Sequence, residues 1–254
     1  MKQAMRKRVE FIGPMGAGKS VICSDLIKGN SYSLECAKSA KRKIILDEVK
    51  KKSRAYCYLT KGLLRRGHFF NVLIDKNITE IARSAMEENA KWRDFIELVM
   101  SQGFSNEAPC FEKVRRAERF IRDVTDLALL NEKAGPGRVI VHDESIAQRG
   151  VGLSLGFEAP LEFSKAYFES APLPDVIVHV DCSNEELMEA RIRNRDRSDM
   201  ARHLGTIKKA CEISRLGVKI MRGRGVMVIE CDGEREISEN ADDIEMQVKR
   251  VKQG

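Results

Sequence analysis

The chain has 254 residues, of which 43% are hydrophobic and 33% are charged, so it can bury a core beneath an unusually charged surface. It carries 45 lysines and arginines against 38 aspartates and glutamates, and the net charge of +7 favours an anionic partner such as a phosphate ester, nucleic acid or acidic lipid. No apolar run reaches the roughly 18 residues of a membrane-spanning helix, and the basic start lacks the apolar stretch of a secretory signal.

The seven cysteines are an odd number and include no CxxC pair. This usage argues against a disulfide or zinc framework, and it predicts a reducing, cytoplasmic compartment. We expect the cysteines to pack as small hydrophobic side chains.

Short apolar segments alternate with helical segments along the chain. The segments expected to be strands are residues 8–12, 31–34, 138–142, 174–180 and 226–230. A helix is expected at 19–28, directly after the first strand, and another at 238–252. Strands separated by helices predict an α/β fold in which helices flank a parallel sheet.

The region from residue 35 to residue 133 has an almost wholly helical pattern of apolar residues. Glycine and proline interrupt this pattern at 103–109, and a further break at 135–137 separates it from the next strand. We interpret 35–133 as a large helical insertion that lies over the sheet, within a single domain that spans residues 1–254.

A glycine-rich loop joins the first expected strand to the following helix. Its residues Gly13, Pro14, Met15, Gly16, Ala17, Gly18, Lys19 and Ser20 fit G-x-x-x-x-G-K-[ST], the Walker A pattern, and Val21 follows. Glycines let successive backbone N–H groups point at phosphate oxygens, and the helix adds its positive end. Lys19 is then expected to reach the β and γ phosphates of ATP, facing solvent or phosphate rather than the core, while Ser20 ligates Mg²⁺. The alternative, a chance glycine turn, is disfavoured by the strand before the loop and the helix after it.

Two acidic residues, Asp143 and Glu144, follow the expected strand 138–142 directly, where a Walker B acid belongs. Asp143 is expected to hold Mg²⁺ through a water. Glu144 is expected to orient an attacking hydroxyl or to accept its proton. The alternative is that both acids cap the helix that begins near Ser145.

At these motifs the chain resembles the P-loop nucleoside and nucleotide kinase superfamily, and its layout is most similar to thymidylate and deoxynucleoside kinases. The segments that carry the resemblance are residues 9–20, 139–149, 174–197 and 226–233. The resemblance implies a P-loop kinase fold with a five-stranded parallel sheet in the order 2-3-1-4-5, and a phosphate site at the carboxyl ends of the strands. It implies ATP and Mg²⁺ as cofactors.

An arginine-rich segment follows the strand 174–180, and the resemblance implies that residues 185–205 form a lid. It places Arg191 near the adenine and closes Arg195 and Arg197 over the phosphates. The loop after the last strand, with Asp232 and Gly233, would lie against the adenine. The spacing supports an anionic partner independently, since such closely spaced arginines on one helix repel each other. A solvated helix with local ion pairs is the alternative.

The chain departs from both family fingerprints at the acceptor site. Thymidylate kinases usually carry Asp-Arg, and deoxynucleoside kinases Glu-Arg-Ser, where this chain has Asp143-Glu144-Ser145. Gln148 and Arg149 either contact the acceptor, or Arg149 pairs with a nearby acid. We expect acceptor specificity to reside in the insertion 35–133, and a sugar, polyol, antibiotic or lipid-like acceptor is as compatible as a nucleoside.

The main functional hypothesis is an ATP-dependent phosphotransferase that moves the γ-phosphoryl group to a small-molecule hydroxyl or phosphate. One alternative is a nucleoside or nucleoside monophosphate kinase. An alternative of another class is a P-loop ATPase or switch protein that acts on a macromolecule, although the chain has neither an Asn-Lys-x-Asp nor a Leu-Ser-Gly-Gly-Gln motif. Among its basic clusters only residues 65–70 approach the interleaved aromatics of a nucleic-acid surface, which argues against a nucleic-acid partner. A homodimer is compatible with the sequence.

Overall fold

The computed structural model describes residues 7–29, 34–52, 83, 90–104, 109–135, 137–194 and 205–253. Five strands form one sheet in the order β2-β3-β1-β4-β5, and every pair of neighbours is parallel. The strands are β1 (Lys7–Ile12), β2 (Leu34–Cys36), β3 (Val139–His142), β4 (Val176–Asp181) and β5 (Met227–Asp232). The expected α/β fold and strand order are therefore confirmed.

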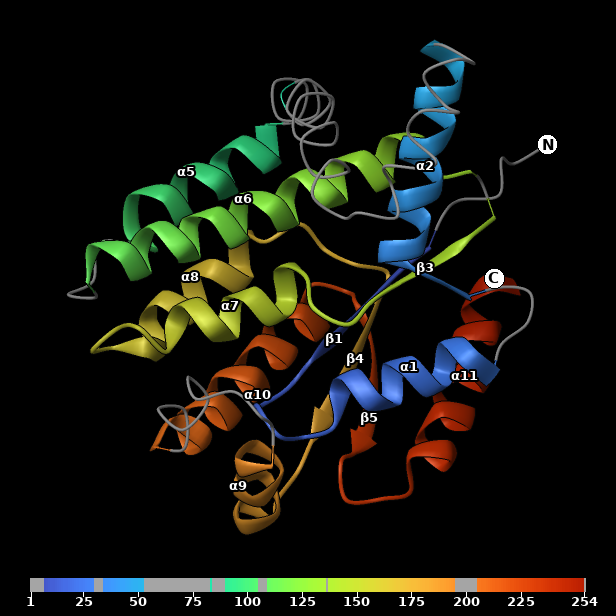
Figure 1. Cartoon of the computed structure of the whole chain (residues 1–254). Helices are drawn as coiled ribbons and strands as arrows, with labels where there is room; N and C mark the ends of the chain where they lie inside the picture. Colours follow the sequence, from blue (N-terminus) through green and yellow to red (C-terminus); the bar gives the residue numbers. More distant parts are fainter. Residues whose placement is uncertain are drawn as a thin grey trace.

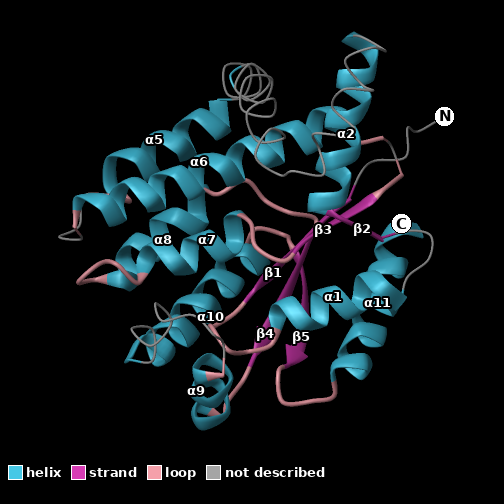
Figure 2. Ribbon diagram, in the orientation of Figure 1, coloured by secondary structure: helices cyan, strands magenta, loops and turns pink. Residues whose placement is uncertain are grey.

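Helices cover both faces of this sheet, and Figure 2 shows the strands as a layer between them. Their bounds are α1 (Lys19–Gly29), α2 (Ala37–Lys52), α5 (Ala90–Gln102), α6 (Cys110–Lys133), α7 (Ile146–Ser154), α8 (Pro160–Ser170), α9 (Glu185–Arg193), α10 (Ile207–Gly223) and α11 (Ile237–Gln253). Figure 1 shows α1 and α11 together on one side, and α7, α8 and α10 on the other with α5 and α6 beyond them. Within the described part of the chain, no helix is both long and apolar enough to cross a bilayer.

Two hydrophobic cores lie on opposite faces of the sheet, because successive side chains of a strand point in opposite directions. Val9 and Phe11 of β1 enter the core beneath α1 and α11. Ile12 enters the core formed with α5, α6, α7, α8 and α10. Arg8 and Glu10 are also buried, and their charged groups form an ion pair of 3.0 Å between Nε and Oε1. The second face of β1 therefore buries two charges as well as apolar side chains.

The second strand lies later in the chain than expected. It was predicted at 31–34, but β2 is Leu34–Cys36, and residues 31–33 lie outside the described part. Residues 35 and 36, which we expected to begin the helical insertion, complete this edge strand instead. A charged residue such as Glu35 is not typical of a short strand, so the sequence pattern does not indicate this one. In the structure the charge of Glu35 is balanced by ion pairs with Lys43 and Arg138.

Two glycines of α7, Gly150 and Gly152, test how tightly the core that Ile12 enters is packed. A Cβ atom at Gly150 would lie 2.6 Å from the Tyr167 ring and 2.8 Å from the Phe168 ring, whereas one at Gly152 would meet nothing within 4 Å. We expect Gly150→Ala to lower the free energy of unfolding by about 1–3 kcal/mol through overpacking. Gly152→Ala, in the same helix, should leave it unchanged or raise it by up to about 1 kcal/mol.

Urea denaturation followed by circular dichroism measures both variants. A Gly150→Ala protein as stable as the Gly152→Ala protein would contradict the packing of α7 against α8.

Candidate active site

The loop between β1 and α1 has a backbone that only glycine adopts readily. Gly16 and Gly18 have φ angles of +85° and +102°. A Cβ at Gly16 would lie 2.7 Å from the carbonyl oxygen of Met188 on α9. The Walker A glycines therefore serve two needs here, a left-handed turn and the close approach of a neighbouring helix.

Lys19 lies inside the curve of this loop. Its Nζ donates hydrogen bonds to the carbonyl oxygens of Gly13 and Pro14, at 2.8 and 2.7 Å, and the residue is only 8% exposed. Lys19 is therefore not exposed to solvent in this conformation, because the loop carbonyls attract the ammonium, and its expected contact with phosphate stays a prediction. Ser20 and Val21, the next residues of α1, are both exposed.

The carboxylates after β3 lie at the same edge of the sheet as the loop, since β3 is the neighbour of β1. Asp143 is about one-third exposed, and its Oδ2 lies 3.7 Å from Nζ of Lys38. Burial, and then the Asp143 charge, raise the pKa of the Cys23 thiol to about 12, which places this carboxylate near the start of α1. The structure therefore brings Asp143 toward the helix that carries Ser20. Glu144 is exposed.

The first turn of α7 is held by a residue that the sequence analysis did not single out. Glu10 of β1 accepts a hydrogen bond at Oε2 from the backbone N–H of Ala147, at 2.9 Å. The N-cap residue Ser145 makes no capping hydrogen bond with its side chain. The signal for Glu10 was present, since a carboxylate in the middle of an apolar strand requires a buried partner.

Gln148 and Arg149 are both engaged within the protein. Gln148 accepts a hydrogen bond at Oε1 from the backbone N–H of Gly13, at 3.1 Å, which ties α7 to the first residue of the loop. Arg149 Nε donates to Asp123 of α6 at 2.6 Å, as in the second of the two alternatives for this residue. Burial raises the pKa of Asp123 to about 6, although Arg149 opposes that rise.

Arg191 joins three parts of the site. Its Nη1 donates to the carbonyl oxygens of Gly16 and Gly233, at 3.2 and 2.9 Å. Gly233 follows β5, and its N–H donates to the carbonyl oxygen of Asp181 at 2.7 Å. The side chain of Asp232 accepts from the N–H of Glu234 at 2.8 Å. The loop after β5, the glycine loop and α9 are thus held together at the place where the family resemblance implies an adenine site, and that role stays a prediction.

Three further arginines of the expected lid are Arg193, Arg195 and Arg197. Arg193 is exposed and pairs with Glu189 one turn earlier in α9, as the solvated-helix alternative expects. Arg195 and Arg197 lie outside the described residues. Their predicted contact with phosphates stays a prediction.

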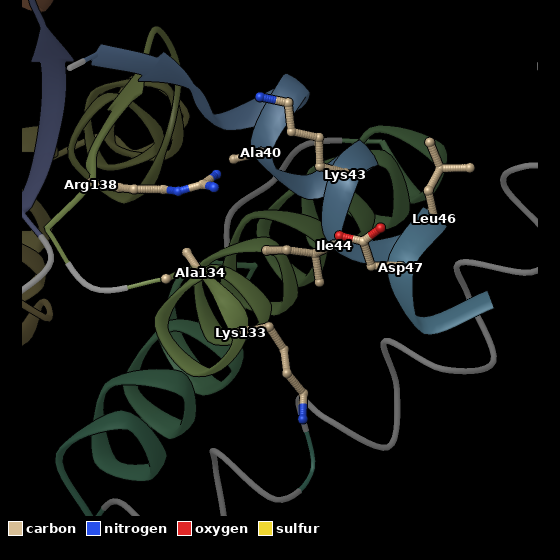
Figure 3. Close-up of a pocket in the computed structure, with 9 residues that line it drawn as sticks. Ala40, Lys43, Ile44, Leu46, Asp47, Lys133, Ala134 and Arg138 are labelled. Atoms are coloured by element: carbon tan, nitrogen blue, oxygen red, sulfur yellow. The ribbon is translucent and has the colours of Figure 1, made fainter. Parts of the chain in front are cut away.

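One cavity, shown in Figure 3, lies away from these residues. It has a volume of about 210 Å³ and lies between α2, the end of α6 and the start of β3, where Ala40, Lys43, Ile44, Leu46, Asp47, Lys133, Ala134, Gly135 and Arg138 line it. Arg138 precedes β3, while Asp143 follows it, so the cavity lies at the opposite edge of the sheet. Lys43 and Arg138 both bind Glu35.

A solved structure of deoxyadenosine kinase from M. mycoides, with the products dCMP and a flexible dCDP bound, matches 96% of this chain and 99% of its own length with a TM-score of 0.50. The chain has a deoxynucleoside kinase-like P-loop fold. The likeness is one of fold, since only 11% of residues are identical. Structures of the same enzyme with dCTP or dATP match with a TM-score of 0.47 at 11% and 10% identity. No family model matches the chain, and no curated protein matches its sequence.

The contacts of Arg191 generate a prediction about nucleotide binding. Arg191→Ala removes the hydrogen bonds to both loops, so we expect the affinity for a fluorescent ATP analogue to fall by about tenfold, which is about 1.4 kcal/mol. The matched control is Arg193→Ala, in the same turn of α9, which loses only an exposed ion pair and should bind like the wild type. Equal affinities for the two variants in an equilibrium titration would contradict the fastening role of Arg191.

Proposed function

We propose that the chain is an ATP-dependent phosphotransferase that moves the γ-phosphoryl group to a hydroxyl or phosphate of a small-molecule acceptor. The observation that carries this proposal is the arrangement at the carboxyl edge of the sheet. There, a Walker A loop with a buried lysine lies beside two carboxylates at the end of the adjacent strand.

The loop and α1 supply the binding of the triphosphate. Backbone N–H groups and the positive end of α1 favour an anion at this place. Lys19 is already held inside the loop by two carbonyl oxygens. On binding, its ammonium exchanges those oxygens for oxygens of the β and γ phosphates, which carry full charges and therefore attract it more strongly.

The residues present also fit Mg²⁺. Ser20 offers an exposed hydroxyl, and Asp143 offers a partly exposed carboxylate near the same helix. Mg²⁺ prefers such oxygen ligands and keeps several waters, so one protein carboxylate suffices. Within the described residues no group of three or more His, Cys, Asp or Glu side chains could hold a metal, and this kind of site does not require one. Ser20 and Asp143 would hold the ion, which neutralises phosphate charge when bound.

The acceptor is proposed to bind at the carboxyl edge of the sheet, beside the start of α7. Glu144 is exposed there and accepts the proton of an attacking hydroxyl. Gln148 positions α7 against the glycine loop. Arg195 and Arg197 are proposed, from the sequence, to neutralise the charge that develops on the transferred group.

A nucleoside or nucleoside monophosphate is the second candidate for the acceptor, and the deoxynucleoside kinase-like fold favours it. The experiment that tests the proposal is a screen for ADP release over nucleosides, nucleotides, sugars and aminoglycoside-like compounds, with mass spectrometry of the product. ADP that forms only when an acceptor is present supports a phosphotransferase. Phosphate release at the same rate without any acceptor would instead support the ATPase alternative.

Lys19→Ala tests the loop. We expect turnover to fall by about 10²-fold or more, because an electrostatic contact to the transferred phosphoryl group is lost. Lys28→Ala, at the exposed end of the same helix, is the matched control and should keep wild-type turnover. Circular dichroism and urea denaturation verify that the Lys19 variant is folded, since its ammonium binds two carbonyl groups of the loop. Wild-type turnover in a folded Lys19→Ala protein would contradict the assignment of residues 13–20 as the phosphate-binding loop.

Asp143→Asn tests the metal ligand. The substitution removes one negative charge, so we expect a higher Mg²⁺ concentration for half-maximal turnover and a lower kcat. Glu144→Gln should lower kcat for a hydroxyl acceptor without changing that Mg²⁺ concentration. Steady-state rates over a Mg²⁺ titration separate the two effects, and an unchanged titration for Asp143→Asn would exclude Asp143 as a ligand.

A further inference from the structure

Three arginines lie within electrostatic reach where α6 packs against α7: Arg119 and its neighbours Arg115, on α6, and Arg149, on α7. Arg116 follows Arg115 in the same turn of α6. Arg115, Arg119 and Asp123 are spaced by four residues and so share one face of α6. The contact of 2.6 Å between Asp123 and Arg149 shows that this face is turned toward α7. Figure 1 shows the two helices next to each other.

Two of these guanidinium groups have no counter-charge of their own. Arg115 lies 3.4 Å from Glu112, and Arg149 is paired with Asp123. Among the described residues, Arg119 has neither a hydrogen bond nor an ion pair. Nη1 of Arg116 is buried and likewise has no hydrogen-bond partner there. A positive cluster of this kind is stabilised when an anion binds to it.

The electrostatics of Arg119 agree with this geometry. Arg119 is exposed at the surface, and partial desolvation of its guanidinium lowers its pKa first, while the like charges of Arg115 and Arg149 lower it further. Glu144 and Glu112 act in the opposite direction without cancelling that effect. The surroundings of Arg119 are therefore positive on balance, even though a carboxylate lies near.

The same neighbours place the cluster at the proposed reaction site. Glu144, the proposed proton acceptor, acts electrostatically on both Arg119 and Arg149. Gln148, which precedes Arg149, binds the N–H of Gly13 in the glycine loop. A ligand held by this cluster would lie beside the end of β3, on the acceptor side of the loop.

We propose that the arginine cluster of α6 and α7 binds a phosphate group of the acceptor, so that the acceptor is a phosphomonoester rather than a neutral nucleoside or sugar. This inference rests on the proposed function. Guanidinium groups match the oxygens of a phosphomonoester in geometry and charge. A nucleoside monophosphate and a sugar phosphate share this chemistry, and the experiment distinguishes them.

The transfer step balances for both. An acceptor oxygen forms a bond to the γ phosphorus while the bond from that phosphorus to the β–γ bridging oxygen breaks, and ADP leaves with the electron pair. If the nucleophile is a hydroxyl, its proton passes to Glu144. If the nucleophile is the acceptor's own phosphate, an ionised oxygen attacks and no proton is transferred.

The test compares matched acceptors in the ADP-release assay: nucleosides with their 5′-monophosphates, and sugars with their phosphates. We expect the phosphorylated member of the active pair to have a kcat/KM at least about 100-fold higher, since two or more charge-assisted hydrogen bonds depend on it. Product mass spectrometry shows which source, nucleotide or sugar, is used. A preference for the neutral member would overturn the inference while leaving the proposed phosphotransferase intact.

Arg119→Ala supplies the second arm. It should raise KM for the phosphorylated acceptor by about 10-fold or more while KM for ATP stays unchanged, and Arg119→Lys should recover part of the loss. Arg122→Ala, one turn along α6 in an exposed ion pair with Glu118, is the control and should behave as wild type. Equal acceptor KM values for Arg119→Ala and Arg122→Ala would overturn the inference. If no acceptor stimulates ADP release but the ATP analogue binds, both proposals fail.

Discussion

The hydrogen bonds that neighbouring elements make to the backbone of the glycine loop determine how the rest of the site is arranged. Arg191 binds the carbonyl oxygen of Gly16, Gln148 binds the N–H of Gly13, and Lys19 binds two carbonyl oxygens from within. Each such bond contributes only about 0.5–1.5 kcal/mol net, but a broken one would leave a polar group unpaired in a largely buried place. The loop is therefore fixed relative to α7, α9 and the loop after β5 at once.

The buried carboxylate of Glu10 also helps to fix the position of α7 in the site. A buried carboxylate costs several kcal/mol unless it is paired and hydrogen-bonded. Here Arg8 supplies the opposite charge, and the N–H of Ala147 supplies a hydrogen bond at the positive end of α7. The charge in the strand thus orients the helix that follows Asp143 and Glu144. Tyr167 of α8, which donates to the carbonyl oxygen of Ile146 at 2.8 Å, also holds the start of that helix.

The sequence was sufficient for those features that depend on local chemistry. Strand, glycine loop and helix follow one another directly within residues 7–29, so their pattern predicts both the loop and the sheet edge at which it lies. The sequence was insufficient where a distant partner decides. Glu35 belongs to a strand because Arg138 pairs with it across the sheet, and Arg149 is paired because α6 presents Asp123. The inward direction of Lys19 depends on where the loop carbonyls point, and a motif does not specify that.

The central claim is that this loop binds the triphosphate of ATP beside the carboxylates of β3. The most direct measurement is a crystal structure with Mg²⁺ and a non-hydrolysable ATP analogue. We expect the β and γ phosphates to lie within the loop and Nζ of Lys19 to have left the carbonyl oxygens of Gly13 and Pro14 for phosphate oxygens. We also expect Asp143 to lie within one bridging water of the metal ion. A triphosphate bound elsewhere, with Lys19 still bonded to its own loop, would contradict this claim.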